Sequence, residues 1–467
     1  MGISLTKDTE SFKQDIRQLE RYILSKALEW ARKILKAVLE QLDDLLKATR
    51  DKKLKILDKR DTWYKTYLGP IKVKRRYYRD PSGVCHYLLD ELLNMDKYCH
   101  TTVDVQRLAL EMASVMTFRR SAEVLEKTTQ INLSHQTIKN MVTKVADKGL
   151  EQKETEIMHF IETGEIAEGN GKKTNILLME ADGTMLSLQR QKAKKAEVKL
   201  GIAYEGWDKI GKDRYRTINK TFYADIASSE RFWAGFSLQL QSKYDLAGIN
   251  RFVLGGDGAT WIKDGLDYFG GTFQLSRFHY NRELRRILGN DKESIALIQK
   301  ACKKGDIATV NKELEMLRTT ANGERAAELK RLQHYLVSNA SGLKDYREET
   351  KTGTMLRSTG AMEGNVSKLI ARRMKNQGMS WSPRGIRSML CIRFKVLEKK
   401  LDEYLHGNAP NSNLPVRGKK KVNYVLDKVM KQNYIEWFHG EMPALYGPHP
   451  SRPWVRILKS LTEVPVI

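Results

Sequence analysis

The stretch ILLMEADG at residues 176–183 decides the fold of this chain, and RFVLGGDG at residues 251–258 repeats its pattern. In each stretch an apolar run leads into Asp-Gly, which predicts a buried strand that delivers an aspartate, Asp182 or Asp257. Functional side chains gather at the strand ends of α/β sheets. Carboxylates are also the ligands that hard cations such as Mg²⁺ prefer. We therefore predict a pair of aspartates at one edge of a sheet.

A third carboxylate candidate is Glu363, in TGAMEGN at residues 359–365, where the last strong helix begins. If this helix packs on the sheet, Glu363 can reach both aspartates. Each acid also has an ordinary structural explanation. Asp182-Gly183 would form the turn of a plain hairpin, Asp257 would cap the helix that follows it, and Glu363 would favour its own helix dipole. The pattern leaves these alternatives open, together with the competing acids Glu180, Glu197, Asp225, Asp245, Asp264 and Asp267.

The residues around these stretches predict a mixed α/β sheet, because strand patterns come first and helical patterns then alternate with later strands. The predicted strands are 176–179, 185–189, 198–204, 252–254 and 272–275, with an edge strand within 215–225. The predicted helices are 229–242, 259–268, a helical block at 281–350, 361–375 and a further helical region at 386–405.

The N-terminal part predicts a long helix followed by a hairpin. Apolar residues recur about every 3.7 positions over residues 12–48, which is the period of an amphipathic helix that docks on its own protein or on a partner subunit. Residues 62–89 alternate aromatic and β-branched residues around turn signals. Within them, KVKRRYYR at residues 72–79 suits a strand along a phosphate backbone, with Lys72, Lys74, Arg75 and Arg76 as contacts. The alternative is a solvated basic edge strand.

Residues 104–148 predict a helix-turn-helix. The helices are 119–127 and 134–144, joined by a turn, and Ser134 is a suitable N-cap for the second. The exposed side of that recognition helix would carry His135, Gln136, Lys139 and Asn140. The alternative is an ordinary pair of short helices, which are common in proteins that bind no nucleic acid.

The composition excludes several classes. A chain of 467 residues predicts two to four domains, and 41% hydrophobic residues predict a folded protein. No apolar run reaches about 18 residues, which excludes a membrane span, and the N-terminus lacks the apolar core of a signal peptide. Four scattered cysteines favour a reducing, cytoplasmic compartment over a disulfide framework, and their spacing fits no familiar zinc site. No Walker-type motif is present, so ATP use is not expected.

The net charge of +25 predicts a polyanionic partner, and its distribution sharpens the prediction. Residues 1–150 carry +9, residues 151–280 carry zero, and residues 351–467 carry +13. Basic regions thus flank a neutral segment that contains both aspartates. The alternative for the C-terminal part is simply a soluble basic helical tail.

Several motifs in order resemble a DDE transposase of bacterial insertion sequences, and more narrowly the ISLre-type family, which is related to the Mutator-like superfamily. They are EADG at 180–183, IAYEGW at 202–207, GDGATWI at 256–262, RFH at 277–279, and Glu363 followed by RMK at 373–375 and GMSWS at 378–382. The resemblance implies an RNase H-like catalytic core with a helical insertion between the second aspartate and the glutamate. It implies Asp182, Asp257 and Glu363 as catalytic acids that hold two Mg²⁺ or Mn²⁺ ions.

The resemblance also implies double-stranded DNA as the partner, both transposon ends and target, and a homodimer or higher oligomer. DNA contacts near the site would come from His279, Arg372, Arg373 and Lys375, and Trp381 would stack on a frayed base; ordinary packing is the alternative for His279 and Trp381. Ser276 departs from the pattern, because an acid or Cys usually stands three positions before this His.

The predicted protein is a multidomain α+β transposase, cytoplasmic and nucleoid-associated, without a membrane span. The alternative is a captured, catalytically weakened copy that still binds DNA, and a basic structural or RNA-binding protein is a third class. The predicted division is 1–60 long helix, 61–100 hairpin, 101–150 helix-turn-helix, 170–283 first part of the core, 284–350 helical insertion, 351–405 second part of the core, and 406–467 basic tail.

Overall fold

The computed structural model describes residues 16–93, 95, 100–165, 171–348, 355–376 and 378–406. These residues divide into two compact units. The first unit contains residues up to 109 together with 119–135 and 405–406, and the second contains 110–118 and 136–404. The predicted basic tail from residue 407 onward lies outside the described residues, as do residues 1–15 of the predicted N-terminal region.

In the first unit a long helix packs on a three-stranded antiparallel sheet. The elements are α2 (Ile16–Thr49), β1 (Lys55–Thr66), β2 (Gly69–Arg79), β3 (Cys85–His86) and a short α3 (Leu88–Leu92). Their common core consists of Leu39, Leu42, Leu46, Tyr64, Ile71, Val73 and Leu89. The predicted long helix and hairpin are confirmed. The helix docks on its own protein, and the hairpin begins earlier than predicted, at Lys55.

Three helices follow, α4 (Val103–Val115), α5 (Phe118–Thr129) and α6 (His135–Thr163). The second and third confirm the two helices of the predicted helix-turn-helix. The predicted recognition helix is longer than expected, since α6 continues for 29 residues. The boundary between the units falls after His135 and also crosses α4.

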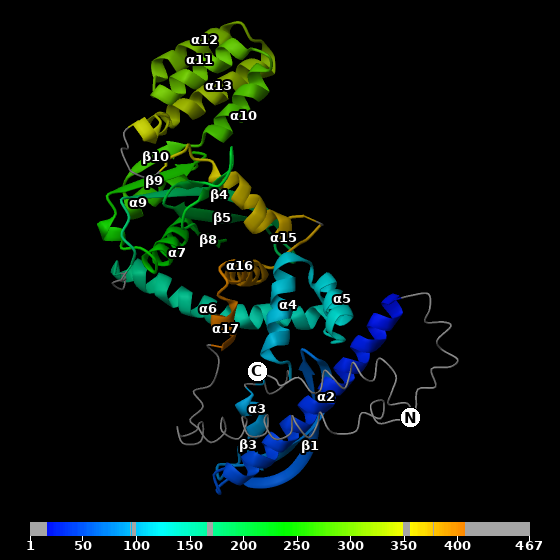
Figure 1. Ribbon diagram of the computed structural model, residues 1–467. Coiled ribbons are helices and arrows are strands. Elements are labelled where there is room, and N and C mark those ends of the chain that lie inside the picture. The colour runs from blue at the N-terminus through cyan, green and yellow to red at the C-terminus, as the bar shows by residue number, and fades with distance from the viewer. Residues whose placement is uncertain are drawn as a thin grey trace. The chain divides into compact units, whose positions relative to one another are not determined.

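The second unit is built on a five-stranded mixed sheet with the spatial order β10-β9-β4-β5-β8 (Figure 1). The strands β4, β5 and β8 pair antiparallel in this order. On the other edge of β4, β9 pairs with it in parallel, and β10 pairs in parallel with β9. The bounds are β4 (Ile176–Ser187), β5 (Lys195–Tyr204), β8 (Thr221–Asp225), β9 (Arg251–Gly256) and β10 (Thr272–Leu275). The predicted mixed α/β sheet is confirmed. A small ribbon of β6 (Trp207–Lys209) and β7 (Tyr215–Thr217) lies outside this sheet.

Strand β4 differs from the prediction in a way that matters for the site. It runs unbroken for 12 residues because β5 pairs with it to its last residue, so the predicted division into two strands is wrong. The hairpin-turn alternative for Asp182-Gly183 is wrong for the same reason. The parallel ladder with β9 stops earlier, at Glu180. Asp182 therefore lies within the strand, opposite Leu200 of β5. On its other edge, β4 is no longer paired with β9 at this position.

Helix α7 (Ser229–Gln241) covers one face of the sheet with apolar side chains. The shared core includes Phe232, Trp233 and Phe236 from the helix and Leu177, Met179 and Ala181 from β4. Because successive strand residues point to opposite faces, Glu180 and Asp182 point to the other face. That second face is where the candidate site lies.

Four helices form the predicted insertion, which lies at the β10 edge of the sheet (Figure 1). They are α10 (Arg277–Leu288), α11 (Lys292–Lys304), α12 (Ile307–Thr319) and α13 (Gly323–Ser338). Asp291 and Asp306 cap α11 and α12, since each carboxylate accepts a backbone N–H three residues later. Two short helices, α8 (Thr260–Lys263) and α9 (Gly265–Phe269), replace the single helix predicted at 259–268.

The C-terminal helices follow the insertion. The elements α14 (Ala361–Asn365), the π-helical turn η4 (Val366–Ala371) and α15 (Arg372–Met374) are consecutive and occupy the predicted helix, and α16 (Pro383–Leu397) and α17 (Leu401–His406) come after. π-Helical turns within helices are rare, and those that do occur are frequently found at functional sites. Among the described helices, none is both long and apolar enough to cross a bilayer.

Candidate active site

Three side chains from distant parts of the second unit come together: Asp182, His279 and Glu363. One ligand atom of each, a carboxylate oxygen or a ring nitrogen, lies within 4.8 Å of the other two. Asp182 comes from β4, His279 from the first turn of α10, and Glu363 from α14. The fold therefore brings two of the three predicted acids together and adds a histidine.

Asp182 is partly buried, and the neighbouring groups shift the pKa of its carboxyl. Burial raises the pKa of Asp182, and the nearby Asp257 and Glu363 carboxylates act in the same direction. The hydrogen bond from the Gly183 N–H to Oδ1, 2.7 Å long, and the His279 ring act in the opposite direction. The charged form of Asp182 therefore gains from any additional cation placed next to it.

Asp257 lies near this group but does not belong to it. Its Oδ1 accepts a hydrogen bond from the Ala259 N–H at 2.9 Å, which forms an Asx turn just before α8 instead of the predicted cap on the helix itself. Its backbone carbonyl accepts a hydrogen bond from the Tyr335 hydroxyl of α13 at 2.6 Å. Since its charge acts on Asp182, the third predicted acid lies within electrostatic range of Asp182.

Glu180 holds the helix that bears Glu363. Its side chain is buried, and its carboxylate accepts backbone hydrogen bonds from Gly360 at 3.0 Å and from Ala361 and Met362 at 3.1 Å. The Tyr204 hydroxyl also donates to it. The first N–H groups of a helix have no partner within the helix, and a negative charge there is favourable.

Glu180 is therefore a positioning residue, not a free candidate ligand. Its hydrogen bonds fix the start of α14 on β4, one residue before Glu363. The sequence left Glu180 among the competing acids. The signal that could have distinguished it is its spacing of two from Asp182, which puts both side chains on one face of the strand.

His279, which was predicted as a DNA contact near the site, lies against the two carboxylates of Asp182 and Glu363. Helix α10 begins directly after β10, where the Ser276 N–H donates to the Gly256 carbonyl at 2.7 Å. The Phe278 and His279 rings meet edge to face, with centroids 5.4 Å apart. The half-buried imidazole is thus tied to the sheet through the turn that precedes it.

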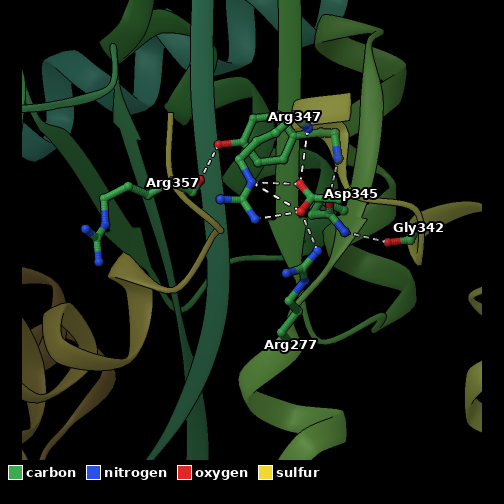
Figure 2. Close-up of polar contacts among 7 residues, drawn as sticks. Arg277, Gly342, Asp345, Arg347 and Arg357 are labelled. Atoms are coloured by element: carbon green, nitrogen blue, oxygen red, sulfur yellow. Dashed lines mark hydrogen bonds and ion pairs between the residues drawn. The ribbon is translucent and has the colours of Figure 1, made fainter. Parts of the chain in front are cut away.

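A cluster around Asp345 ties both ends of the helical insertion together (Figure 2). Asp345 follows the insertion, is almost fully buried, and pairs with Arg277 and Arg347, each at 2.6 Å. Arg277 begins α10 and lies two residues before His279, so the ion pair also fixes the start of this helix. Further hydrogen bonds of the cluster run from Gln274 to the Gly342 carbonyl, from the Tyr346 N–H to Gln274, and from the Tyr346 hydroxyl to the Arg357 carbonyl.

Replacing Asp345 by Asn should remove a pH-dependent part of the stability. Burial alone would raise the pKa of Asp345, but the hydrogen bonds from Arg347 and the charge of Arg277 outweigh it and lower the pKa to about 2. A carboxylate with a lowered pKa stabilises the fold above its unfolded pKa of about 3.9 and loses this contribution as the pH falls. We expect the melting-temperature difference between wild type and Asp345→Asn to be largest near neutral pH and to shrink from about pH 4 downward. A difference that is independent of pH would contradict this.

Two predicted DNA contacts near the site are buried in the structure, which corrects the prediction. Arg373 is 2% exposed and donates to the Ala113 carbonyl at 2.6 Å, and Trp381 is 7% exposed and donates to the Met374 carbonyl at 2.9 Å. The Arg393 guanidinium likewise donates to the Ser114 carbonyl. The last carbonyls of α4 have no partner within that helix, and these arginines satisfy them. For Trp381 the packing alternative is therefore what the structure shows.

Two predicted contacts in the same segment are exposed, Arg372 and Lys375. The Lys375 Nζ lies 3.4 Å from the Thr184 Oγ1. Thr184 is two residues beyond Asp182 on β4 and therefore lies on the same face. Lys375 thus places a positive charge beside the candidate site.

Arg75 and Arg76 of the first unit are also buried, which corrects their prediction as DNA contacts. Arg75 pairs with Asp90 at 2.7 Å and Arg76 with Asp43 at 2.6 Å, because a buried charge needs a partner. The other predicted contacts outside the second unit's core are exposed: Lys72, Lys74, His135, Gln136, Lys139 and Asn140. Trp63 was not among the predicted contacts, although this β1 side chain is 58% exposed and lies opposite Lys72 of β2.

Comparison with known proteins places the chain in a family. Residues 9–402 match the family described as "Uncharacterised protein family (UPF0236)", and the chain belongs to this family. A UPF0236 protein of Caldanaerobacter subterraneus subsp. tengcongensis is 26% identical over 366 residues, which cover 77% of this chain and 73% of the relative. A second protein of that organism, whose name joins eleven locus designations, is 25% identical over 368 residues, 78% and 73% of the two chains. The "UPF0236 protein in vanSb 3'region" of Streptococcus gallolyticus is 25% identical over 399 residues, 81% and 82%.

Proposed function

We propose that this protein is a DDE transposase, which binds the ends of a mobile DNA element and cleaves and transfers DNA strands by metal-dependent phosphoryl transfer. The observation that carries the proposal is the meeting of Asp182 and Glu363 on one face of the sheet, with Asp257 in electrostatic range. The topology supports it. In this sheet β4, β5 and β8 pair antiparallel, and β9 and then β10 add in parallel on the other side of β4, which is the strand order expected of an RNase H-like core. The helical insertion lies between Asp257 and Glu363 in the sequence.

The residues present fit a divalent cation. Burial and two neighbouring carboxylates disfavour an isolated negative charge on Asp182, and the ligand atoms of Asp182 and Glu363 already lie within 4.8 Å of each other. Asp182, Asp257 and Glu363 would hold two Mg²⁺ or Mn²⁺ ions. Such ions, when bound, act as Lewis acids toward the phosphoryl oxygens and activate a water or a 3′-hydroxyl as the nucleophile.

The remaining exposed basic residues would hold the DNA. Lys375 and Arg372 follow Glu363 on the same helical segment and suit contacts to phosphates, which position DNA without reading its sequence. The exposed face of α6 that bears Gln136 and Lys139 would read the element's ends. We propose double-stranded DNA as the partner, a nucleoid-associated location, and a homodimer or higher oligomer, since two ends must be joined.

A property of the relatives supports the proposal. The name of one Caldanaerobacter protein joins eleven locus designations. A protein encoded at many places in one genome is what a mobile element produces.

The deciding experiment uses the DNA on either side of the coding region. Purified full-length protein is incubated with linear DNA that contains these flanks, in Mg²⁺ or Mn²⁺, and new ends are mapped. We expect cuts that leave 3′-hydroxyl ends at the borders of inverted repeats, and no cuts with a chelator. Binding without cutting in either ion would favour the alternative, a captured transposase that acts as a DNA-binding protein.

The double substitution of Lys72 and Lys74 by Ala tests the hairpin as a phosphate contact. Both side chains are exposed, and Lys72 is held 3.0 Å from Asp61. We expect uniformly weaker DNA binding and a salt dependence whose slope falls by about 0.9 for each phosphate that the variant no longer neutralises. Binding measured from low to moderate salt gives the slope. The matched control is Lys300→Ala with Lys312→Ala, two exposed lysines of the insertion; an equal effect there would argue against a specific role for the hairpin.

A further inference from the structure

We infer that His279 is a ligand of one of the two divalent cations that the proposed site would hold, the one between Asp182 and Glu363, and that its nitrogen makes this position bind Mn²⁺ in preference to Mg²⁺. The inference rests on the proposed function for the presence of a cation between Asp182 and Glu363. It starts from one observation. The group that closes within 4.8 Å contains two carboxylates and an imidazole, whereas Asp257, the third predicted acid, lies outside it.

The spacing suits a single shared ion. Protein oxygen and nitrogen ligands lie about 2.0–2.2 Å from such an ion, so two ligand atoms are about 3 Å apart when adjacent and about 4.4 Å apart when opposite. The ligand atoms of the three side chains all lie within 4.8 Å of one another, which is close to the longer of these two spacings.

Each of the three side chains is attached to the sheet by its own contacts. Asp182 belongs to β4, and Glu363 is positioned by the hydrogen bonds from α14 to Glu180. His279 is held through the ion pair of Arg277 with Asp345 and through the turn at the start of α10. A metal site is precise when its ligands stand on rigid elements supported in this way.

The donor set then decides which ion is preferred. Mg²⁺ demands oxygen ligands in a strict octahedral arrangement and gives up its waters reluctantly. Mn²⁺ shares the carboxylate and water ligands of Mg²⁺, but as a first-row transition-metal ion it accepts an imidazole nitrogen more readily than Mg²⁺ does. A site with one imidazole and two carboxylates therefore favours Mn²⁺, and removal of the imidazole should lower the affinity for Mn²⁺ more than that for Mg²⁺.

The test measures metal binding by the full-length protein without DNA. Electron spin-echo spectroscopy of the bound Mn²⁺ should show coupling to a ¹⁴N nucleus in the wild type and no such coupling in His279→Ala. The Mn²⁺ affinity of His279→Ala should fall by about tenfold or more, with a smaller change for Mg²⁺. His334→Ala, which removes an exposed histidine of α13, is the control and should keep both the coupling and the affinity.

The inference is overturned if the wild type shows no nitrogen coupling, if the coupling survives in His279→Ala, or if the Mn²⁺ affinity is unchanged. Unchanged Mn²⁺ binding with weaker DNA binding would make His279 a DNA contact instead. The outcome is separable from that of the proposed function. Coupling that depends on His279 in a protein that never cuts DNA would uphold the ligand and refute the transposase.

Discussion

The Asp182→Asn variant is expected to bind the element's ends as well as the wild type and to cut them about a thousandfold more slowly or not at all. Asparagine keeps the shape of the side chain and one acceptor oxygen, but it loses the charge that holds a cation. Cutting of end-labelled flank DNA in Mg²⁺ and in Mn²⁺ measures the effect. A variant that cuts at the wild-type rate would show that Asp182 is not a catalytic acid.

The same variant should be at least as stable as the wild type, which separates a catalytic role from a structural one. Because burial raises the pKa of Asp182, its ionised form is disfavoured in the folded state and opposes folding at neutral pH. Without divalent ions, Asp182→Asn should therefore melt at an equal or higher temperature. Added Mn²⁺ should raise the melting temperature of the wild type and not that of the variant. Asp267→Asn, an exposed acid on α9, is the matched control for both assays.

The Glu180→Gln variant should lose both stability and cutting. Its side-chain amide offers only one acceptor oxygen to three backbone N–H groups and turns an N–H₂ group toward them. We expect a loss of about 3 kcal/mol or more in the free energy of unfolding, since unpaired buried groups remain. Displacement of Glu363 by about an ångström should slow cutting by about a hundredfold. Chemical unfolding and the cutting assay measure the two effects.

A matched control distinguishes displacement of Glu363 from general loss of stability. Glu205 lies just after β5, is also buried, and pairs with Lys172 at 2.6 Å. Glu205→Gln should destabilise the protein while the folded fraction keeps its Mn²⁺ affinity, whereas Glu180→Gln should weaken Mn²⁺ binding even when fully folded. Glu180→Asp, which keeps the charge, should restore part of both properties. Equal Mn²⁺ affinities in the two Gln variants would refute the positioning role.

The sheet could largely be predicted because its buried strands read as apolar runs. The strand at 272–275 was predicted with the bounds that β10 has, and the long helix of the first unit followed from its period. The division of β4 was wrong because Asp-Gly is a strong local turn signal. What overrides it is pairing with β5 along the whole strand, which is a contact between strands and leaves no local mark.

The site was only partly predictable for a related reason. Asp182 and Glu363 could be proposed from their positions in motifs, but the roles of Glu180 and His279 depend on residues from other elements. The burial of the arginines could not be predicted from the sequence either. Arg75 and Lys74 are neighbours in one basic run, yet only Arg75 meets a buried partner, Asp90. Which basic side chain of such a run stays exposed to solvent depends on the residues of other elements that pack against the strand.

The hydrogen bonds from Gly360, Ala361 and Met362 to Glu180 also set the time at which the site can exist. They join residues 180 to 182 positions apart. At about 5–20 residues per second, about 9 to 36 s separate the synthesis of Glu180 from that of its partners. Until then the nascent chain has Asp182 but no Glu363. Under the proposed function, a polypeptide released by the ribosome before residue 360 would keep the basic hairpin and lack Glu363, and would therefore compete for DNA ends without cutting them.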